Sequence, residues 1–169
     1  MSIRDSLALL LLVAAVGCSQ AKQDPAAKGD VATPAAEAKG DYNPHDVPIT
    51  EEQKAELRKE TAKFPGAVAK LKEFRQATEE ETKNGIPQNP YKAHQALDKA
   101  DLLLQWIPGI ARDSGVPSEK WETVTTTAND LRTLFEQVHQ NIDNKKDPNF
   151  KAVAGEIDQK ITQLEKVSR

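Results

Sequence analysis

Histidine and carboxylate side chains are the groups in this chain that could do chemistry, and the histidines are few. The sequence holds three histidines, His45, His94 and His139. His94 is followed four residues later by Asp98, and Asp101 comes next along the same segment. This spacing places the three side chains on neighbouring parts of one helix surface, which gives a metal ion only a partial grip without a fourth ligand. Because His94 lies more than a quarter turn from the apolar face of its segment, we interpret it as a solvated or boundary residue.

Glu136 and His139 form a Glu-x-x-His element. It resembles the elements of ferritin-like di-iron bundles, where two copies and two further glutamates point inward. The apolar face of this segment is centred near Leu131 and Val138. At 100° per residue, Glu136 falls roughly 135° and His139 about 75° from that centre. The two side chains therefore diverge, and since the sequence has no second copy of the element we expect no metal centre.

The sequence patterns of common enzymes are missing. There is no G-x-S-x-G nucleophile elbow and no phosphate-binding P-loop, and no histidine is placed near a plausible nucleophile. Nucleic-acid binding needs a basic face, whereas this chain has a formal net charge of −3 with both signs interspersed. We therefore expect neither an enzyme nor a nucleic-acid-binding protein.

The single cysteine, Cys18, excludes a disulfide framework, a CxxC redox pair and a zinc knuckle, because each of these needs more thiols. It follows a short polar start with Arg4, an apolar run over Leu7–Val16 and the small residue Gly17. This is the layout of a secretory signal, in which residues 1–17 are removed. The apolar run has about ten residues, half of what a membrane-spanning helix needs, so we expect no permanent transmembrane anchor.

The sequence Ala15-Val16-Gly17-Cys18 resembles the lipobox of bacterial lipoproteins. The resemblance implies that Cys18 is the lipidated first residue of the mature protein, bearing acyl chains such as palmitate. Two or more acyl chains hold a protein firmly on a membrane. Ser19, where an aspartate would direct retention, implies the periplasmic face of the outer membrane by the sorting rule of Gram-negative lipoproteins. The alternative is an ordinary signal peptidase site followed by a free cysteine.

Residues 18–48 differ in composition from the rest of the chain. The segment is rich in Ala, Pro, Lys, Asp and Gly and has few large apolar residues. Since it cannot bury enough apolar surface to fold by itself, we expect a disordered tether between the lipid and a helical domain over residues 49–169. An alternative is that Tyr42–Pro48 docks on the domain as an arm.

The first predicted helix begins with a capping box at Thr50–Gln53. Its apolar positions keep helical phase across Pro65-Gly66, and Asn84-Gly85 ends it because these residues tolerate positive φ. We therefore expect one long helix that is kinked at Pro65.

The second predicted helix begins at Asn89-Pro90, is interrupted at Pro108-Gly109 and ends at Gly115. Leu102 and Trp106 face roughly opposite to its apolar face. A surface Trp-Leu pair is typical of a contact site, since Trp offers a large area at low entropic cost. We interpret the pair as a possible partner contact; the alternative is packing against the first helix or the tether.

The third predicted helix, which begins near Pro117-Ser118, shows the strongest pattern in the chain. Its apolar residues alternate in steps of three and four: Trp121, Val124, Ala128, Leu131, Phe135, Val138 and Ile142. A fourth helix begins at Asp147-Pro148 and fades at Val167. Because the loops are short and no segment alternates with period two, we expect an all-α, up-down-up-down four-helix bundle with proline-kinked first and second helices. The alternative is that one helix pairs with a partner chain.

Residues 129–167 resemble the last two helices of periplasmic cytochrome b and cytochrome c-prime bundles in pattern and loop placement. The resemblance implies a haem held by a terminal-helix histidine, with a methionine or a CxxCH attachment. This chain has none of these haem ligands at the required positions. The last helix has no histidine, Met1 is the only methionine, and a single cysteine cannot form CxxCH. We expect the fold without haem or another cofactor.

The sequence predicts a membrane-anchored envelope lipoprotein whose helical domain is a binding or structural module for an envelope partner. The alternative is a small ligand or redox carrier.

Overall fold

The computed structural model describes residues 47–167, and these residues are helical with no strand among them. The signal, Cys18 and almost all of the predicted tether lie outside the described residues, as does His45. Within the described part, no helix is both long and apolar enough to cross a bilayer. A short 3-10 turn, Ser118–Lys120, precedes the fourth of five α-helices: α1 (Glu51–Glu60), α2 (Phe64–Thr82), α3 (Tyr91–Asp113), α4 (Trp121–Asp143) and α5 (Phe150–Val167).

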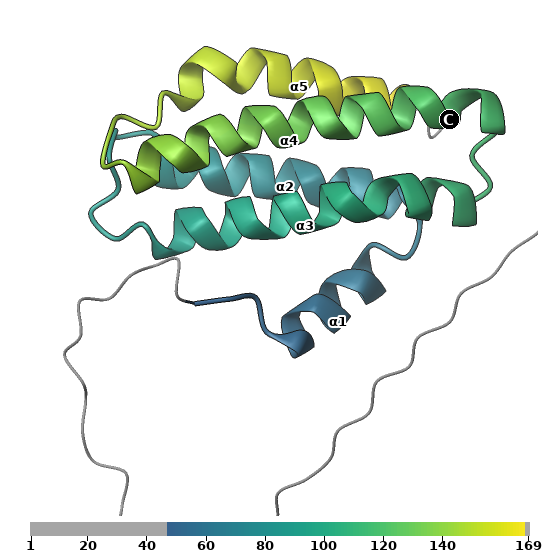
Figure 1. Ribbon diagram of the computed structural model, residues 1–169, viewed down its shortest axis with the longest axis horizontal. Helices are drawn as coiled ribbons and strands as arrows, with labels where there is room; N and C mark the ends of the chain where they lie inside the picture. The colour runs from purple at the N-terminus through teal and green to yellow at the C-terminus, as the bar shows by residue number, and fades with distance from the viewer. Residues whose placement is uncertain (1–46, 168–169) are drawn as a thin grey trace, which may run out of the picture. The chain divides into compact units, whose positions relative to one another are not determined.

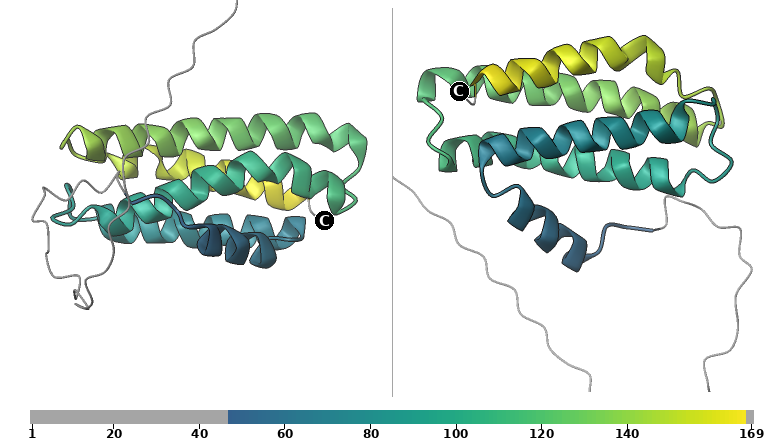
Figure 2. Two further views of the ribbon diagram at one scale, coloured as in Figure 1. Left: turned by 60° about the horizontal axis from the view of Figure 1, so that its bottom comes forward. Right: turned by 180° about the vertical axis from the view of Figure 1, so that it is seen from behind.

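Four of the helices, α2 to α5, lie side by side around a shared core (Figures 1 and 2). Each of them packs on its neighbour in the sequence, and α5 also packs on α2. The short helix α1 lies outside this group, where it contacts α2 and contributes Leu57 to the core. The start of α3 therefore lies beside the end of α4, because the chain reverses direction between these two helices (Figure 1).

The predicted capping box at the start of α1 is confirmed. The Thr50 hydroxyl accepts a hydrogen bond from the Gln53 amide at 3.2 Å, and the Thr50 amide donates to Gln53 Oε1 at 3.0 Å. Both bonds satisfy backbone groups that the first turn of a helix leaves without partners. Hydrogen bonds from its own backbone amide and from the Thr50 side chain lower the pKa of Glu52, so this acid stays ionised at the positive end of the helix.

The prediction of one long first helix kinked at Pro65 is wrong. The segment forms two helices, since α1 ends at Glu60 and α2 begins at Phe64. Pro65 has no amide hydrogen, and its ring clashes with the preceding turn, so it fits the first turn of a new helix better than the interior of a long one. A Cβ at Gly66 would lie 3.1 Å from the Glu60 carbonyl oxygen, so glycine permits the close approach of the two helices. The Phe64 amide, without an intrahelical partner, donates to Ser114 Oγ at 2.8 Å.

Helix α3 continues through Pro108 to Asp113, so the predicted interruption does not end it. Its end is at the predicted place, where Gly115 adopts a φ of 78° and donates its amide to the Arg112 carbonyl at 3.0 Å. Glycine takes this left-handed conformation without steric cost. The start is also close to the prediction, since Asn89 Oδ1 accepts a hydrogen bond from the Tyr91 amide at 3.1 Å.

The heptad pattern of α4 predicts its buried face correctly from Val124 to Ile142. Trp121 is the exception, since the side chain is 38% exposed. Its indole nitrogen donates to the Val116 carbonyl at 2.8 Å, and the Arg112 guanidinium lies over its ring. The indole therefore covers the turn before α4 instead of entering the core.

Candidate metal centre

Two His-x-x-x-Asp pairs meet where the start of α3 lies beside the end of α4. His94 and Asp98 are four residues apart on α3, and His139 and Asp143 are four residues apart on α4. Residues at this spacing share one face of a helix. Helices α3 and α4 pack along each other in opposite directions (Figure 1). The two pairs meet across this contact, where His94 lies beside Asp143 and His139 beside Asp98.

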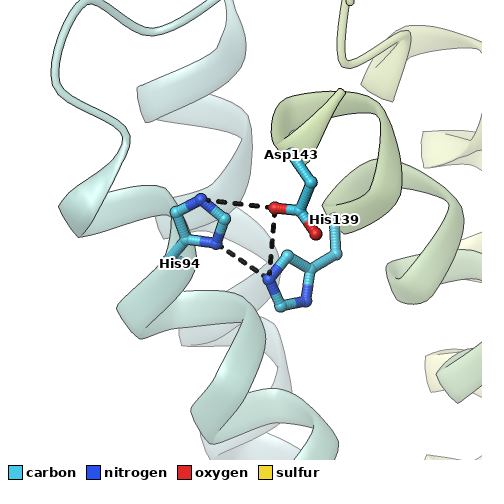
Figure 3. Close-up of side chains that lie close together, drawn as sticks. All are labelled: His94, His139 and Asp143. Atoms are coloured by element: carbon cyan, nitrogen blue, oxygen red, sulfur yellow. Dashed lines mark hydrogen bonds and ion pairs between the residues drawn. The ribbon is translucent and has the colours of Figure 1, made fainter. Parts of the chain in front are cut away.

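The two imidazole rings touch. Nδ1 of His94 lies 2.8 Å from Nε2 of His139, and the ring planes are inclined by 58°. Oδ1 of Asp143 lies 3.6 Å from Nε2 of His94 and 3.8 Å from Nε2 of His139. Figure 3 shows the three side chains close together between the two helices, with His139 and Asp143 each facing a different nitrogen of the His94 ring. One ligand atom from each of the three residues lies within 4.8 Å of the others.

The cluster is closed on the side of the core and open toward solvent. The His94 side chain is 2% exposed, that of His139 19% and that of Asp143 32%. The interpretation of His94 as a solvated or boundary residue is therefore wrong. Helices α2 and α4 both pack on α3, so the buried arc of α3 is wider than one inward stripe and includes His94.

A buried imidazole needs partners for both ring nitrogens, and this cluster supplies them. One nitrogen of each ring faces the other ring, so a single proton is shared between His94 Nδ1 and His139 Nε2 when both rings are neutral. The carboxylate of Asp143 faces the second nitrogen of His94. In this form the hydrogen bond between the two rings, with the Asp143 carboxylate beside them, holds α3 in register with α4.

The same three groups form a donor set that suits a transition-metal ion. In a tetrahedral site with bonds of about 2.0–2.1 Å, neighbouring ligand atoms are about 3.3 Å apart. With Nδ1 of His94 as its donor, Nε2 of His139 lies 2.8 Å from that atom and 3.8 Å from Oδ1 of Asp143, on either side of that value. The 3.6 Å contact of Asp143 is with the other nitrogen of His94, which cannot bind the same ion. Two imidazoles and a carboxylate are ligands for zinc and for ferrous iron. A metal ion would take the place of the proton that the two rings share.

The other predicted ligands lie elsewhere. Asp101 Oδ1 accepts from Arg132 Nε at 2.7 Å, and Asp101 Oδ2 accepts from Gln105, so this acid belongs to a surface ion pair. Glu136 is exposed and accepts from Gln140 Nε2 at 2.9 Å, away from the two rings.

Glu136 and His139 diverge as predicted, since Glu136 pairs with Gln140 and His139 meets His94. The interior of the bundle is one direction in which ligands can converge. The contact between two adjacent helices is a second such direction. A usable signal was present in the sequence: both histidines of the helical segment are followed by aspartate at the fourth residue. The two pairs sit near the ends of consecutive predicted helices, which places them together in an antiparallel pair. Asp143 is the residue of the cluster that the sequence analysis did not predict, because its role depends on the contact of α4 with α3.

Leu102 and Trp106 are partly buried and pack against the core cluster. The Arg58 guanidinium of α1 lies 4.5 Å from the centre of the Trp106 ring. A shallow hollow beside this ring is lined by Ala62 and Gly109, among others. The Trp106 ring therefore packs in part against the first helical segment, which was the alternative to a partner contact. A partner contact at Leu102 and Trp106 stays a prediction.

No family model matches the chain, and no curated protein or solved structure matches it.

Proposed function

We propose that this protein is a lipid-anchored lipoprotein of the cell envelope whose helical domain binds a divalent transition-metal ion at His94, His139 and Asp143. The observation that carries the metal proposal is the convergence of three ligand atoms within 4.8 Å of one another. The helices α2 to α5 are, in this proposal, an up-down-up-down four-helix bundle that fixes the site.

Anchoring is supported by the sequence around Cys18. A secretory signal, a lipobox-like sequence and one cysteine directly after them favour lipidation, with residues 18–48 as the tether. Radiolabelled palmitate supplied to growing cells should label the wild-type protein and leave a Cys18→Ser variant unlabelled. Fractionation should place the labelled protein with the outer membrane. An unlabelled wild-type protein in the soluble fraction would contradict the anchoring proposal.

Metal binding accounts for the combination of one buried and two more exposed side chains in the cluster. A hydrogen bond that only holds α3 in register with α4 would not require this combination. Burial of His94 holds one ligand in place before any ion arrives, and preorganised ligands raise affinity. The more exposed side chains of His139 and Asp143 leave an entry path from solvent. The domain would then be a carrier or sink for its ion at the envelope, a form of the small-ligand carrier considered as the alternative function.

Calorimetric titration with Zn²⁺ at pH 7 tests the site. The mature, lipidated protein is purified in detergent and used without a histidine tag, after chelator treatment and dialysis. We expect one Zn²⁺ per chain. His139→Gln should lower the affinity by about a hundredfold or more, since even residues that only orient a metal ligand contribute about 10–100-fold.

Glu136→Gln is the matched control, because it removes an exposed acid from the same helix without touching the cluster. Circular dichroism should show the same helix content for all variants. Equal Zn²⁺ affinity in wild type and His139→Gln would overturn the metal proposal and leave the cluster as a hydrogen-bonded contact between helices.

A further inference from the structure

We infer that Asp98 is the fourth ligand of this centre, which makes it a closed, four-coordinate site with two nitrogen and two oxygen donors. This inference rests on the proposed metal binding by His94, His139 and Asp143. It decides whether the ion is held by the protein alone or keeps a position open for another ligand.

Nε2 of His139 has potential ligand atoms from three other residues around it. Oδ1 of Asp98 lies 3.9 Å from it, almost the same distance as the 3.8 Å of Asp143 Oδ1. With Nδ1 of His94 at 2.8 Å, this nitrogen has three potential ligand atoms as neighbours. Each donor atom of a tetrahedral site has three such neighbours, at about 3.3 Å.

The two helices carry their histidine and aspartate in the same order and spacing. In the antiparallel contact of α3 with α4, His94 lies by Asp143 and Asp98 lies by His139, so each histidine has an aspartate of the other helix beside it. The two aspartate side chains are equally exposed, at 32% each. The contact of Asp143 with His139 therefore has a counterpart at Asp98, whereas Asp143 also lies beside His94.

The charge and the donor types of the four side chains suit a divalent ion of the zinc class. Two neutral imidazoles and two carboxylates neutralise one divalent cation, which limits the cost of placing the ion beside a buried ring. Nitrogen and oxygen donors suit Zn²⁺ and similar borderline ions, whereas Cu⁺ prefers thiolates and thioethers. The only cysteine and the only methionine of the chain are Cys18 and Met1.

A closed site has a functional consequence. Catalytic zinc sites keep one coordination position for water or substrate, and structural or storage sites fill it with protein. With Asp98 as a ligand, the protein binds and holds a zinc-class ion and does not activate water on it.

Substitution of Co²⁺ for Zn²⁺ tests the coordination number, because four-coordinate Co²⁺ absorbs visible light far more strongly than six-coordinate Co²⁺. The lipidated protein in detergent is titrated with CoCl₂, and the wild type should give intense visible bands. Asp98→Asn should bind Co²⁺ at least tenfold more weakly and lose most of the band intensity. Asp98→His should restore intensity with shifted bands, since it supplies a fourth donor.

Asp101→Asn is the matched control, because it removes an acid one turn along α3 that pairs with Arg132 instead. This variant should keep the wild-type spectrum. If Asp98→Asn keeps the wild-type intensity and affinity while His139→Gln loses binding, Asp98 is not a ligand and the site is open. If the wild type does not bind Co²⁺ or Zn²⁺ at all, the proposed function itself fails.

Discussion

The two halves of α3 carry the two features that the sequence singles out, and their surroundings differ. In the first half, His94 is buried and meets His139 of α4 at hydrogen-bond distance. In the second half, the Trp106 ring is partly buried and meets the Arg58 guanidinium of the short helix α1. The chemistry available to the side chains in each half of α3 depends on which helix packs against that half. Helix α4 contributes groups of the same chemistry as those of α3, whereas α1 contributes a cover over an apolar ring.

The largest expected effect comes from His94→Ala, which removes the most buried ligand. The affinity for Zn²⁺ should fall by about a hundredfold or more, and the free energy of unfolding of the metal-free protein should fall by about 1–3 kcal/mol because the partners of a buried polar group are left unsatisfied. Calorimetric titration and urea unfolding measure the two quantities. Trp106→Ala, in the second half of α3, is the comparison and should leave Zn²⁺ affinity unchanged. If Trp106→Ala weakens Zn²⁺ binding as much as His94→Ala does, the two halves of α3 do not differ in metal binding.

Acidification should release the ion from the first half of α3. Zn²⁺ binds neutral imidazoles, so protons compete with it. Between pH 7 and pH 5 the apparent affinity should fall, and each binding event should release protons to the buffer. Titrations in buffers of different ionisation enthalpy would detect this release. An affinity independent of pH over this range would mean that the histidines are not ligands.

Trp106→Ala should affect stability moderately, by about 1–2 kcal/mol, because the ring is only partly buried and full burial of an aromatic ring is worth about 3–5 kcal/mol. If the ring is a partner contact, crosslinking to an envelope protein in intact cells should weaken more than the melting temperature falls. A large loss of stability with unchanged crosslinking would assign Trp106 to packing under α1.

Gly109→Ala should have the smallest effect. A Cβ at this helical position meets no atom within 4 Å, and alanine in place of glycine in a helix interior contributes about 0.5–1 kcal/mol of stability. Thermal unfolding should show this gain with unchanged Zn²⁺ affinity. A loss of stability would show that the surface beside Trp106 is more tightly covered than the structure indicates.

The helical class, the capping box at Thr50 and the buried face of α4 could be predicted, because each depends on local spacing within one segment. The break between α1 and α2 could not be predicted from periodicity, because the apolar positions keep the same helical phase on both sides of it.

The site required more than local spacing. His94 and His139 are 45 residues apart in the chain, and only the lateral packing of α3 on α4 brings their rings into contact. A helix seen alone assigns each side chain an inward or an outward direction. The direction toward an adjacent helix becomes visible only when the neighbour is known.

The break between α1 and α2 has a mechanical consequence. Any force on the N-terminal side of the domain enters through α1, a ten-residue helix whose one buried residue is Leu57. Because α1 makes few contacts with the other helices, it would dissociate from them first under force. The four packed helices and the contact between His94 and His139 would stay intact. Unfolding of α1 would lengthen the chain by about 2 nm, because a residue spans about 3.5 Å when extended and 1.5 Å in a helix. In the proposed lipid-anchored protein, a pull from the membrane would therefore extend α1 before it reached the proposed metal site.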